Sequence, residues 1–319
     1  MAYLVTGGTG FIGSYAVRDL LAAGKDIVCL QRSGVTPLFR QVVGEANVSK
    51  IKVIQGDVSD TVLLFDIIRD NKIDVIVHTG AARAPATEDY PALAIRVNCL
   101  GTANILEAIR LFGLRRMVWI CSGDAFGRVR EYFKGPLGDD DAIFAPDNVY
   151  GATKVLDEFI ARHYFKRYGI DSIGLRVPLT YGFGKNHRPN NFSTRLKMTA
   201  LNKPVVWEGP DAVKSYLYVE DLSTMIVKAC EIATTKTRVF NIVESEWTNK
   251  DLVDLLRKIN PQSRVTLKES PQGARVVEAG NRAITGAKKE LGFKPKYNLE
   301  SGIRKSFNLW RQEAGMPPL

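Results

Sequence analysis

Tyr150 and Lys154 form a YxxxK unit, Tyr-Gly-Ala-Thr-Lys, at the start of a long helical pattern. Residues four apart lie on the same face of a helix. An ammonium group beside a phenol favours the phenolate form, so Tyr150 is a candidate general acid or base toward a hydroxyl or carbonyl group. The spacing also arises by chance, and a surface aromatic–lysine pair is the alternative interpretation.

Ser122 strengthens the catalytic interpretation. It ends an apolar predicted strand, in the segment Cys-Ser-Gly-Asp-Ala-Phe-Gly at 121–127. A hydroxyl group at this place can hydrogen-bond the same substrate oxygen as Tyr150. We therefore predict that Ser122, Tyr150 and Lys154 form one catalytic group.

A glycine-rich turn follows the first predicted strand. Gly7, Gly10 and Gly13 have the spacing GxxGxxG, with Phe11 and Ile12 between the last two, directly before a helical pattern. Glycine permits a tight turn and lets the backbone approach a pyrophosphate. The N–H groups at the helix start then face the phosphates. The turn therefore predicts a dinucleotide site.

The end of the second predicted strand bears on the choice of cofactor. NAD-binding folds usually place Asp or Glu there, whereas this chain has Gln31, followed by Arg32 and Ser33. A neutral Gln31 does not repel a 2′-phosphate, and Arg32 and Ser33 can contact one. We therefore favour NADP over NAD, the alternative being that Arg32 is merely solvated. The remaining candidate cofactor contacts follow the third and fourth strands and are Asp57, Val58, Gly80, Ala81 and Ala82.

Short apolar strands alternate with helices over the first 180 residues. The predicted strands are Ala2–Thr6, Asp26–Gln31, Lys52–Gln55, Val75–His78, Met117–Ser122 and Ser172–Val177, and the predicted helices are Phe11–Ala23, Thr61–Asn71, Pro91–Phe112 and Tyr150–Tyr168. This order is typical of an α/β protein with a doubly wound, Rossmann-type parallel sheet. We predict a cofactor domain over 1–180, to which 213–245 returns, through Ser215–Val219 and Val239–Val243. The rest of 181–319 should form a smaller α+β substrate lobe.

Composition excludes several other classes of protein. The chain has 319 residues, 45% hydrophobic and 24% charged, which is typical of a globular protein and not of a disordered one. No stretch approaches 18 uninterrupted apolar residues, so we expect no membrane span. We read no secretory signal and expect a cytoplasmic protein. The four cysteines and three histidines show no metal-binding spacing, and we expect no metal site.

The net charge of +10 is unevenly distributed. Residues 1–180 hold 21 basic and 20 acidic side chains, and residues 181–319 hold 23 and 14. The basic residues form no long tract and no aromatic stacking motif, so a nucleic-acid partner is not expected. A site for a small anionic ligand or a solvated basic surface explains the excess.

Seven ordered blocks along the chain carry a resemblance to a known family. They include TGGTGFIG at the start, GDVSD at 56–60, VNCLGTANILEA around Asn98, YGATK at Tyr150, LRVPLTYG at 175–182 and SYLYVEDL at 215–222. With these blocks the chain resembles an extended short-chain dehydrogenase/reductase of the NAD-dependent epimerase/dehydratase family, over essentially its whole length.

The resemblance implies roles for the residues already named. Tyr150 would exchange the hydroxyl proton while the nicotinamide takes or returns a hydride, Lys154 would hold the ribose and Ser122 would orient the substrate. Asn98, Tyr150 and Lys154 would also contact the cofactor. The residues that would contact an anionic nucleotide-sugar substrate are Arg83, Asp124, Lys214 and Arg275. A homodimer through the helix that carries YxxxK and the preceding long helix is also implied.

Departures from the family pattern bear on the reaction. Gly123 and Asp124 replace the acidic pair of the dehydratases, and Leu179 replaces an asparagine that contacts the substrate diphosphate in epimerases. We expect an NAD(P)-dependent epimerase of a nucleotide-activated sugar, acting by transient hydride abstraction and return. An NADP(H)-dependent reductase or dehydrogenase of a sugar or small carbonyl compound is the second possibility, a 4,6-dehydratase the third, and a cofactor-binding protein without catalysis the last.

Overall fold

The computed structural model describes residues 2–129, 133–139, 141, 143–185, 191–270 and 282–319, and divides the chain into two compact units. The first unit contains residues 1–177, 223–242 and 283–293. The second contains residues 178–222, 243–282 and 294–319. Each unit has its own sheet and its own buried core.

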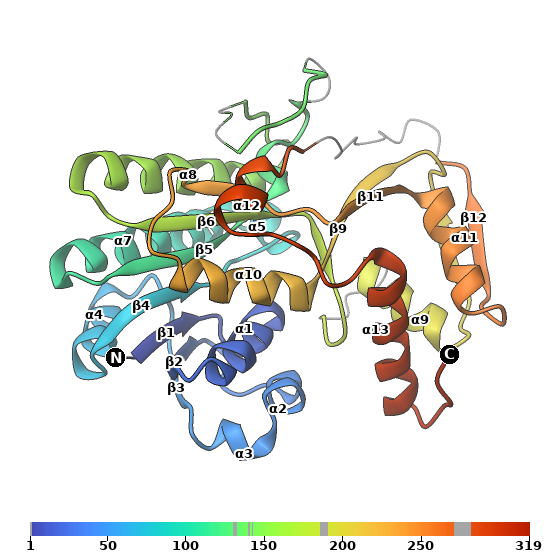
Figure 1. The fold of residues 1–319 in the computed structure, drawn as a ribbon, viewed down its shortest axis with the longest axis horizontal. Coiled ribbons are helices and arrows are strands. Elements are labelled where there is room, and N and C mark those ends of the chain that lie inside the picture. Colours follow the sequence, from blue (N-terminus) through green and yellow to red (C-terminus); the bar gives the residue numbers. More distant parts are fainter. Residues whose placement is uncertain (1, 130–132, 140, 142, 186–190, 271–281) are drawn as a thin grey trace. The chain divides into compact units, whose positions relative to one another are not determined.

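A parallel seven-stranded sheet forms the centre of the first unit (Figure 1). Its strand order is β10-β6-β5-β4-β1-β2-β3, and every pairing is parallel. The strands are β1 (Ala2–Thr6), β2 (Asp26–Gln31), β3 (Lys52–Gln55), β4 (Ile73–His78), β5 (Arg116–Ser122), β6 (Ser172–Val177) and β10 (Val239–Asn241). The order reverses beside β1, which is where doubly wound sheets bind ligands at the carboxyl ends of their strands. The predicted α/β Rossmann-type fold is confirmed.

Helices cover both faces of this sheet. On one face α4, α7 and α8 pack side by side, and on the other the Ser223 hydroxyl of α10 bonds the Tyr15 carbonyl of α1. The helices of this unit are α1 (Phe11–Ala22), α2 (Pro37–Val43), α3 (Glu45–Val48), α4 (Thr61–Asp70), α5 (Ala86–Asp89), α6 (Pro91–Ala94), α7 (Gly101–Phe112), α8 (Val149–Tyr168), most of α10 (Val219–Glu231) and α12 (Thr285–Glu290). Side chains fix several starts: Asp60 caps α4 and Asn148 caps α8.

The expected helix Pro91–Phe112 is continuous but not uniform. It runs through α6, a π-helical segment η1 (Ile95–Leu100) and α7. By length and hydropathy it is the one helix in the described ranges that could cross a membrane, yet 61% of its apolar window is buried inside the structure. The core helix of a globular fold passes the same test, and burial favours that interpretation.

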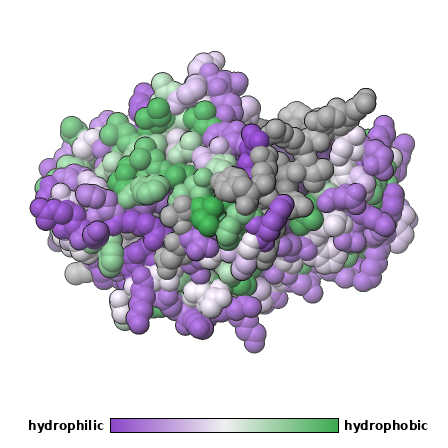
Figure 2. Space-filling view, turned by 90° about the horizontal axis from the view of Figure 1, so that it is seen from above, coloured by the Kyte–Doolittle hydropathy of each residue, from purple (hydrophilic) through white to green (hydrophobic). Residues whose placement is uncertain are grey.

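Figure 2 shows one face of the molecule, on which apolar side chains gather in one area, drawn in green.

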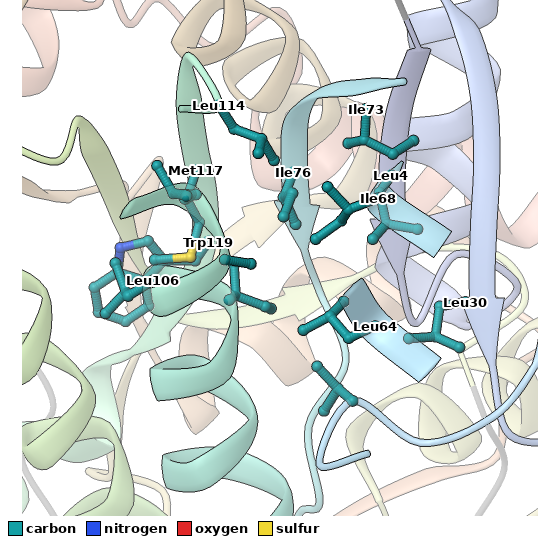
Figure 3. Packing of buried hydrophobic residues seen from close by; sticks show 14 of the residues in the cluster. Leu4, Leu30, Leu64, Ile68, Ile73, Ile76, Leu106, Leu114, Met117 and Trp119 are labelled. Atoms are coloured by element: carbon teal, nitrogen blue, oxygen red, sulfur yellow. The ribbon is translucent and has the colours of Figure 1, made fainter. Parts of the chain in front are cut away.

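Figure 3 shows the core between the sheet and the helices α4 and α7. Leu106 of α7 lies beside Met117 and Trp119 of β5, and Leu64 of α4 lies near Leu30 of β2. All five side chains are buried to within a few per cent. Burying each contributes roughly 1.5–3 kcal/mol, so this core fixes the strand ends that carry the site.

The second unit is built around a three-stranded sheet of order β11-β9-β7 and a two-stranded pair, β12-β8. Its elements are β7 (Leu179–Tyr181), α9 (Phe192–Ala200), β8 (Val205–Glu208), β9 (Val213–Tyr218), β11 (Ser245–Thr248), α11 (Asn249–Ile259), β12 (Val265–Lys268) and α13 (Leu299–Glu313). Of the segment 213–245 that we expected to return to the cofactor domain, β10 and α10 from Ser223 onward lie in the first unit. The strand β9 pairs within the second unit instead.

Candidate functional site

The glycine-rich loop joins β1 to α1 and packs backbone against backbone. Gly7 has φ +69°, and a Cβ there would lie 2.7 Å from the Cα of Gly80. A Cβ on Gly13 would lie 2.2 Å from the Gly7 carbonyl oxygen. The N-cap of α1, Gly10, makes no side-chain cap bond, and the first turn holds no acidic side chain. The loop therefore forms an uncharged cradle at a helix N-terminus, which fits a dinucleotide pyrophosphate.

Two threonines hold the next loop against this cradle. The Thr9 hydroxyl donates to the Gly34 carbonyl at 2.7 Å, and the Thr36 hydroxyl donates to the Thr9 carbonyl at 2.7 Å. These bonds fix the segment of Arg32 and Ser33 beside the glycine loop, in which Phe11 and Ile12 are partly exposed. Neither threonine is predictable from the sequence, because nothing in their spacing distinguishes them from ordinary turn residues.

Asp57 and Val58 follow β3, near the Arg32 segment. The Asp57 carboxylate accepts bonds from the Ser59 backbone and hydroxyl at 2.9 and 2.7 Å. Partial burial acts to raise the pKa of Asp57, but these bonds and the charges of Arg96 and Arg32 leave it below its usual value. Asp57 is therefore ionised at neutral pH and partly offsets the positive charge of Arg32.

The Gly80–Ala82 segment leaves the end of β4, and Asn98 fastens it. The Asn98 side chain accepts from the Ala82 N–H at 2.8 Å and donates to the Ala82 carbonyl at 3.1 Å and to the Thr153 hydroxyl at 3.0 Å. Asn98 is fully buried in η1. A π-helical turn redirects a side chain that a regular helix would place elsewhere. Here the Asn98 side chain connects the segment after β4 to α8, the helix that carries Tyr150, through hydrogen bonds to Ala82 and Thr153.

Ser122 lies at the carboxyl end of β5 and is 8% exposed. Its hydroxyl oxygen accepts the backbone N–H of Asp124 at 3.1 Å, which starts the short turn η2 (Gly123–Ala125). Because this bond uses the oxygen as an acceptor, the Ser122 hydroxyl proton can point toward a substrate oxygen.

Tyr150 lies in the first turn of α8 and is 7% exposed. The next residue, Gly151, lets α8 approach the turn formed by Ser122 and η2, which we call the serine turn. A Cβ on Gly151 would lie 2.4 Å from the Asp124 carbonyl oxygen in this turn. The Lys154 ammonium lies 5.9 Å from the centre of the Tyr150 ring, and the Arg83 guanidinium lies 5.8 Å from it. Two cationic side chains, from Lys154 and Arg83, thus lie within 6 Å of the centre of one phenol ring.

Glu88 is a site residue that the sequence analysis missed. Its carboxylate accepts from the Val149 N–H at 3.0 Å and the Tyr150 N–H at 3.3 Å. The bond from Val149 and those from Thr87 and Tyr150 hold the pKa of Glu88 below its usual value. An acid separated from Tyr150 by 62 residues offers no local sequence signal, yet here it fixes the first turn of the helix that carries the phenol.

Two of the four candidate substrate contacts lie in the first unit. Arg83 and Asp124 are exposed beside Tyr150 and Ser122. Lys214 lies half-buried on β9 in the second unit, where burial and then the charge of Arg195 lower its pKa. Arg275 lies outside the described residues.

Comparisons with known proteins agree with this architecture. The profile described as the NAD dependent epimerase/dehydratase family matches residues 3–243. The UDP-glucose 4-epimerase of Lactobacillus helveticus is 28% identical over 330 residues, covering 93% of each chain. The solved UDP-glucose 4-epimerase of Thermotoga maritima, with UDP-glucose, has a TM-score of 0.85 at 23% identity and covers 98% of this chain and 100% of its own. The UDP-glucuronic acid 4-epimerase of Bacillus cereus, in complex with UDP-glucuronic acid and NAD, has a TM-score of 0.81 at 24% identity, with coverage of 98% and 100%.

Proposed function

Because the chain belongs to the NAD-dependent epimerase/dehydratase family, we propose that it interconverts the C4 epimers of a UDP-activated hexose or hexuronate. The observation that carries this proposal is the approach of the Ser122 turn to Tyr150, which Gly151 permits. In this proposal a hydroxyl, a phenol and an ammonium act together at the carboxyl edge of the sheet, where doubly wound sheets bind dinucleotides. The enzyme is thus of the short-chain dehydrogenase/reductase type.

A nicotinamide held at this edge of the sheet would supply the hydride-transfer chemistry of the reaction. The chain's own residues would transfer the proton and orient the sugar. Tyr150 would take the proton from the sugar hydroxyl and later give it back. Ser122 would donate a hydrogen bond to the same oxygen, and the ammonium of Lys154 would favour the ionised phenol.

The resident cofactor in this proposal is NAD. The sequence-based preference for NADP rests on Gln31 and Arg32, and the solved neighbours, which include an NAD complex, lend it no support. In the structure the ionised Asp57 interacts electrostatically with Arg32 and would oppose a 2′-phosphate nearby. The residues that would hold the cofactor are the glycine loop, the Arg32–Ser33 segment, Asp57, Val58, the Gly80–Ala82 segment, Asn98, Tyr150 and Lys154.

A homodimer is part of the proposal. The helices η1, α7 and α8 leave large apolar side chains exposed, at 41–58% of their surface, namely Ile95, Leu100, Leu111, Phe112, Leu156, Phe159, Phe165 and Tyr168. Figure 2 views the molecule from the side on which α8 lies in Figure 1 and shows apolar side chains gathered in one area. Apolar patches of this kind mark protein–protein contacts. A second copy offering the same three helical elements would cover them.

The domain roles and the location are also proposals. The first unit would bind the cofactor, and Lys214 of the second unit, with Arg275, would bind the diphosphate of the substrate. The four cysteines are free and buried, which supports a reducing, cytoplasmic location.

Proton NMR of purified protein with UDP-glucose, UDP-galactose, UDP-glucuronate or UDP-N-acetylglucosamine tests the function. We expect one of these substrates to convert to its C4 epimer without added NADH or NADPH. A net reductase is the rival, favoured by Leu179 and the Arg32 loop. Consumption of added NADPH in proportion to product, with no epimer formed, would establish that rival and refute the epimerase.

A further inference from the structure

Lys154 has a buried acidic partner on its own helix. Its Nζ lies 3.0 Å from Oδ2 of Asp157, and the two side chains are 1% and 0% exposed. On a helix surface such a pair, three residues apart, would be ordinary. In the interior both charges lose their hydration, so each depends on the other for compensation.

Among the residues that the structure describes, the acidic, histidine and cysteine side chains around this pair are either paired elsewhere or neutral. Glu158 binds Arg176 through both carboxylate oxygens at 2.6 Å. Burial, and then the charge of Lys154, lowers the pKa of His78 on β4 to about 3, so this imidazole is neutral. Among the described neighbours, Asp157 is the acid at hydrogen-bond distance from Lys154.

The two cysteines beside the pair are neutral as well. Burial raises the pKa of the Cys99 thiol to about 11, and that of Cys121 rises well above its usual value for the same reason. Neither thiol supplies a negative charge at the pH at which an enzyme of this kind works.

The second oxygen of Asp157 faces the interior. Oδ1 is buried and makes no hydrogen bond of normal geometry, although the Thr102 hydroxyl lies close enough to lower the pKa of the carboxyl group. Thr102 in turn lies 3.4 Å from Nε2 of His78, whose Nδ1 lies 2.6 Å from the Thr6 hydroxyl. Asp157 therefore joins Lys154 to a row of polar groups running from α8 through α7 to β4 and β1.

The protonation of the pair follows from these contacts. Burial is the largest influence on Lys154 and by itself would lower its pKa, but the surrounding groups, with the charge of Asp157 first among them, together hold the pKa above its usual value. Burial raises the pKa of Asp157, and Lys154 opposes that rise. Lys154 is therefore an ammonium at neutral pH, and Asp157 supplies the negative charge that faces it.

We propose that Asp157 is a positioning residue of the active site, which holds the Lys154 ammonium in place and offsets part of its positive potential at Tyr150. The proposal rests on the proposed function, since it assigns to Tyr150 the proton transfer described above. The proposal predicts the direction in which the pH profile of kcat moves when the charge of Asp157 is removed. When the carboxylate loses its charge, Tyr150 experiences more of the positive potential of the ammonium, and the acidic limb of the activity profile moves to lower pH.

The first test compares the pH profiles of kcat for wild type, Asp157→Asn and Asp157→Glu. We expect the acidic limb to move to lower pH by about one unit in Asp157→Asn, as a charge several ångströms away would cause. It should stay near wild type in Asp157→Glu, which keeps the charge. Glu107→Gln removes a partly exposed carboxylate from the neighbouring helix α7 and should leave the limb unchanged. An unmoved limb in Asp157→Asn, or an equal shift in Glu107→Gln, would overturn the proposal.

The second test needs no activity and separates the proposal from the function. Asp157→Asn leaves the Lys154 ammonium buried without a counter-charge, so its melting temperature should fall. The double variant Lys154→Met, Asp157→Asn removes both charges and should melt well above Asp157→Asn. A double variant as unstable as the single one would refute the pairing even if the protein proves to be no epimerase. The expected recovery of stability in the double variant, together with a wild-type protein that has no epimerase activity, would support the pairing and refute the function alone.

Discussion

Gly151→Ala tests the geometry on which the catalytic assignment depends. In an ordinary helix this change is stabilising, because alanine has the higher helix propensity by about 1 kcal/mol. Here the new methyl group would lie 2.4 Å from the Asp124 carbonyl oxygen, 3.0 Å from its carbon and 3.2 Å from Cβ of Pro146. Two of these three atoms belong to the backbone of the serine turn, which cannot rotate away.

The size of the effect follows from the shift required. Ordinary contact with the Asp124 oxygen needs about 1 Å more separation, which must come from moving α8 or the serine turn. A misplacement of about 1 Å costs on the order of 100-fold in rate, or about 2.7 kcal/mol of transition-state stabilisation. The overpacking costs about 1–3 kcal/mol of folding free energy, partly offset by the gain in propensity.

The assay is the initial rate of epimer formation, measured by NMR, with urea unfolding to confirm the fold. We expect kcat of Gly151→Ala to fall by about 100-fold while the protein stays folded. Ala152→Gly is the matched control, because Ala152 is exposed one residue further along the same helix. It should lose a little stability and keep its kcat. Wild-type kcat in Gly151→Ala would show that the approach of α8 to Ser122 does not serve catalysis.

Four further predictions concern the phenol, the cofactor, the dimer and a buried histidine. Tyr150→Phe should abolish turnover and leave the retained cofactor unchanged, as measured after denaturation; turnover like that of wild type would refute its role. Arg32→Ala should weaken NADP binding much more than NAD binding in fluorescence titrations, and equal losses would remove Arg32 from the 2′ position. Phe159→Glu, 56% exposed in wild type, should give a monomer in light scattering, whereas the control Val62→Glu on α4 should stay dimeric. Burial lowers the pKa of His78 to about 3 in the folded protein. The unfolded chain therefore binds a proton at higher pH than the folded one, and the free energy of unfolding should decrease as the pH drops below about 6.5. Urea unfolding should show a loss of about 2 kcal/mol at pH 5 in wild type and no such loss in His78→Gln.

Local sequence patterns were sufficient to predict most of the strands of the first unit. Four of the six predicted strands, Ala2–Thr6, Asp26–Gln31, Lys52–Gln55 and Ser172–Val177, have the observed bounds. Strands of a parallel sheet are buried on both faces and therefore read as continuous apolar runs between glycine and polar turns. The same patterns do not state which sheet a strand joins, so the strand at 213–218 was expected in the cofactor domain and pairs in the second unit.

The candidate site was predictable where its residues are close in sequence. Tyr150, Lys154 and the glycine loop have spacings that reflect one helix face or one turn. Glu88 acts across the fold and shows no such spacing, whereas Asn98 was predicted from the family resemblance and not from its spacing. Asp157 was missed for a different reason: a lysine and an aspartate three apart look like a solvated pair, and only tertiary packing reveals that both are buried.

The most direct test of the central claim is the identity and occupancy of the nicotinamide released when the purified protein is denatured. A cofactor that is regenerated in every cycle has no need to leave, so we predict nearly one NAD per chain, found without any added cofactor. A protein that emerges empty and binds NADPH only when it is supplied would contradict the account and identify a net reductase instead.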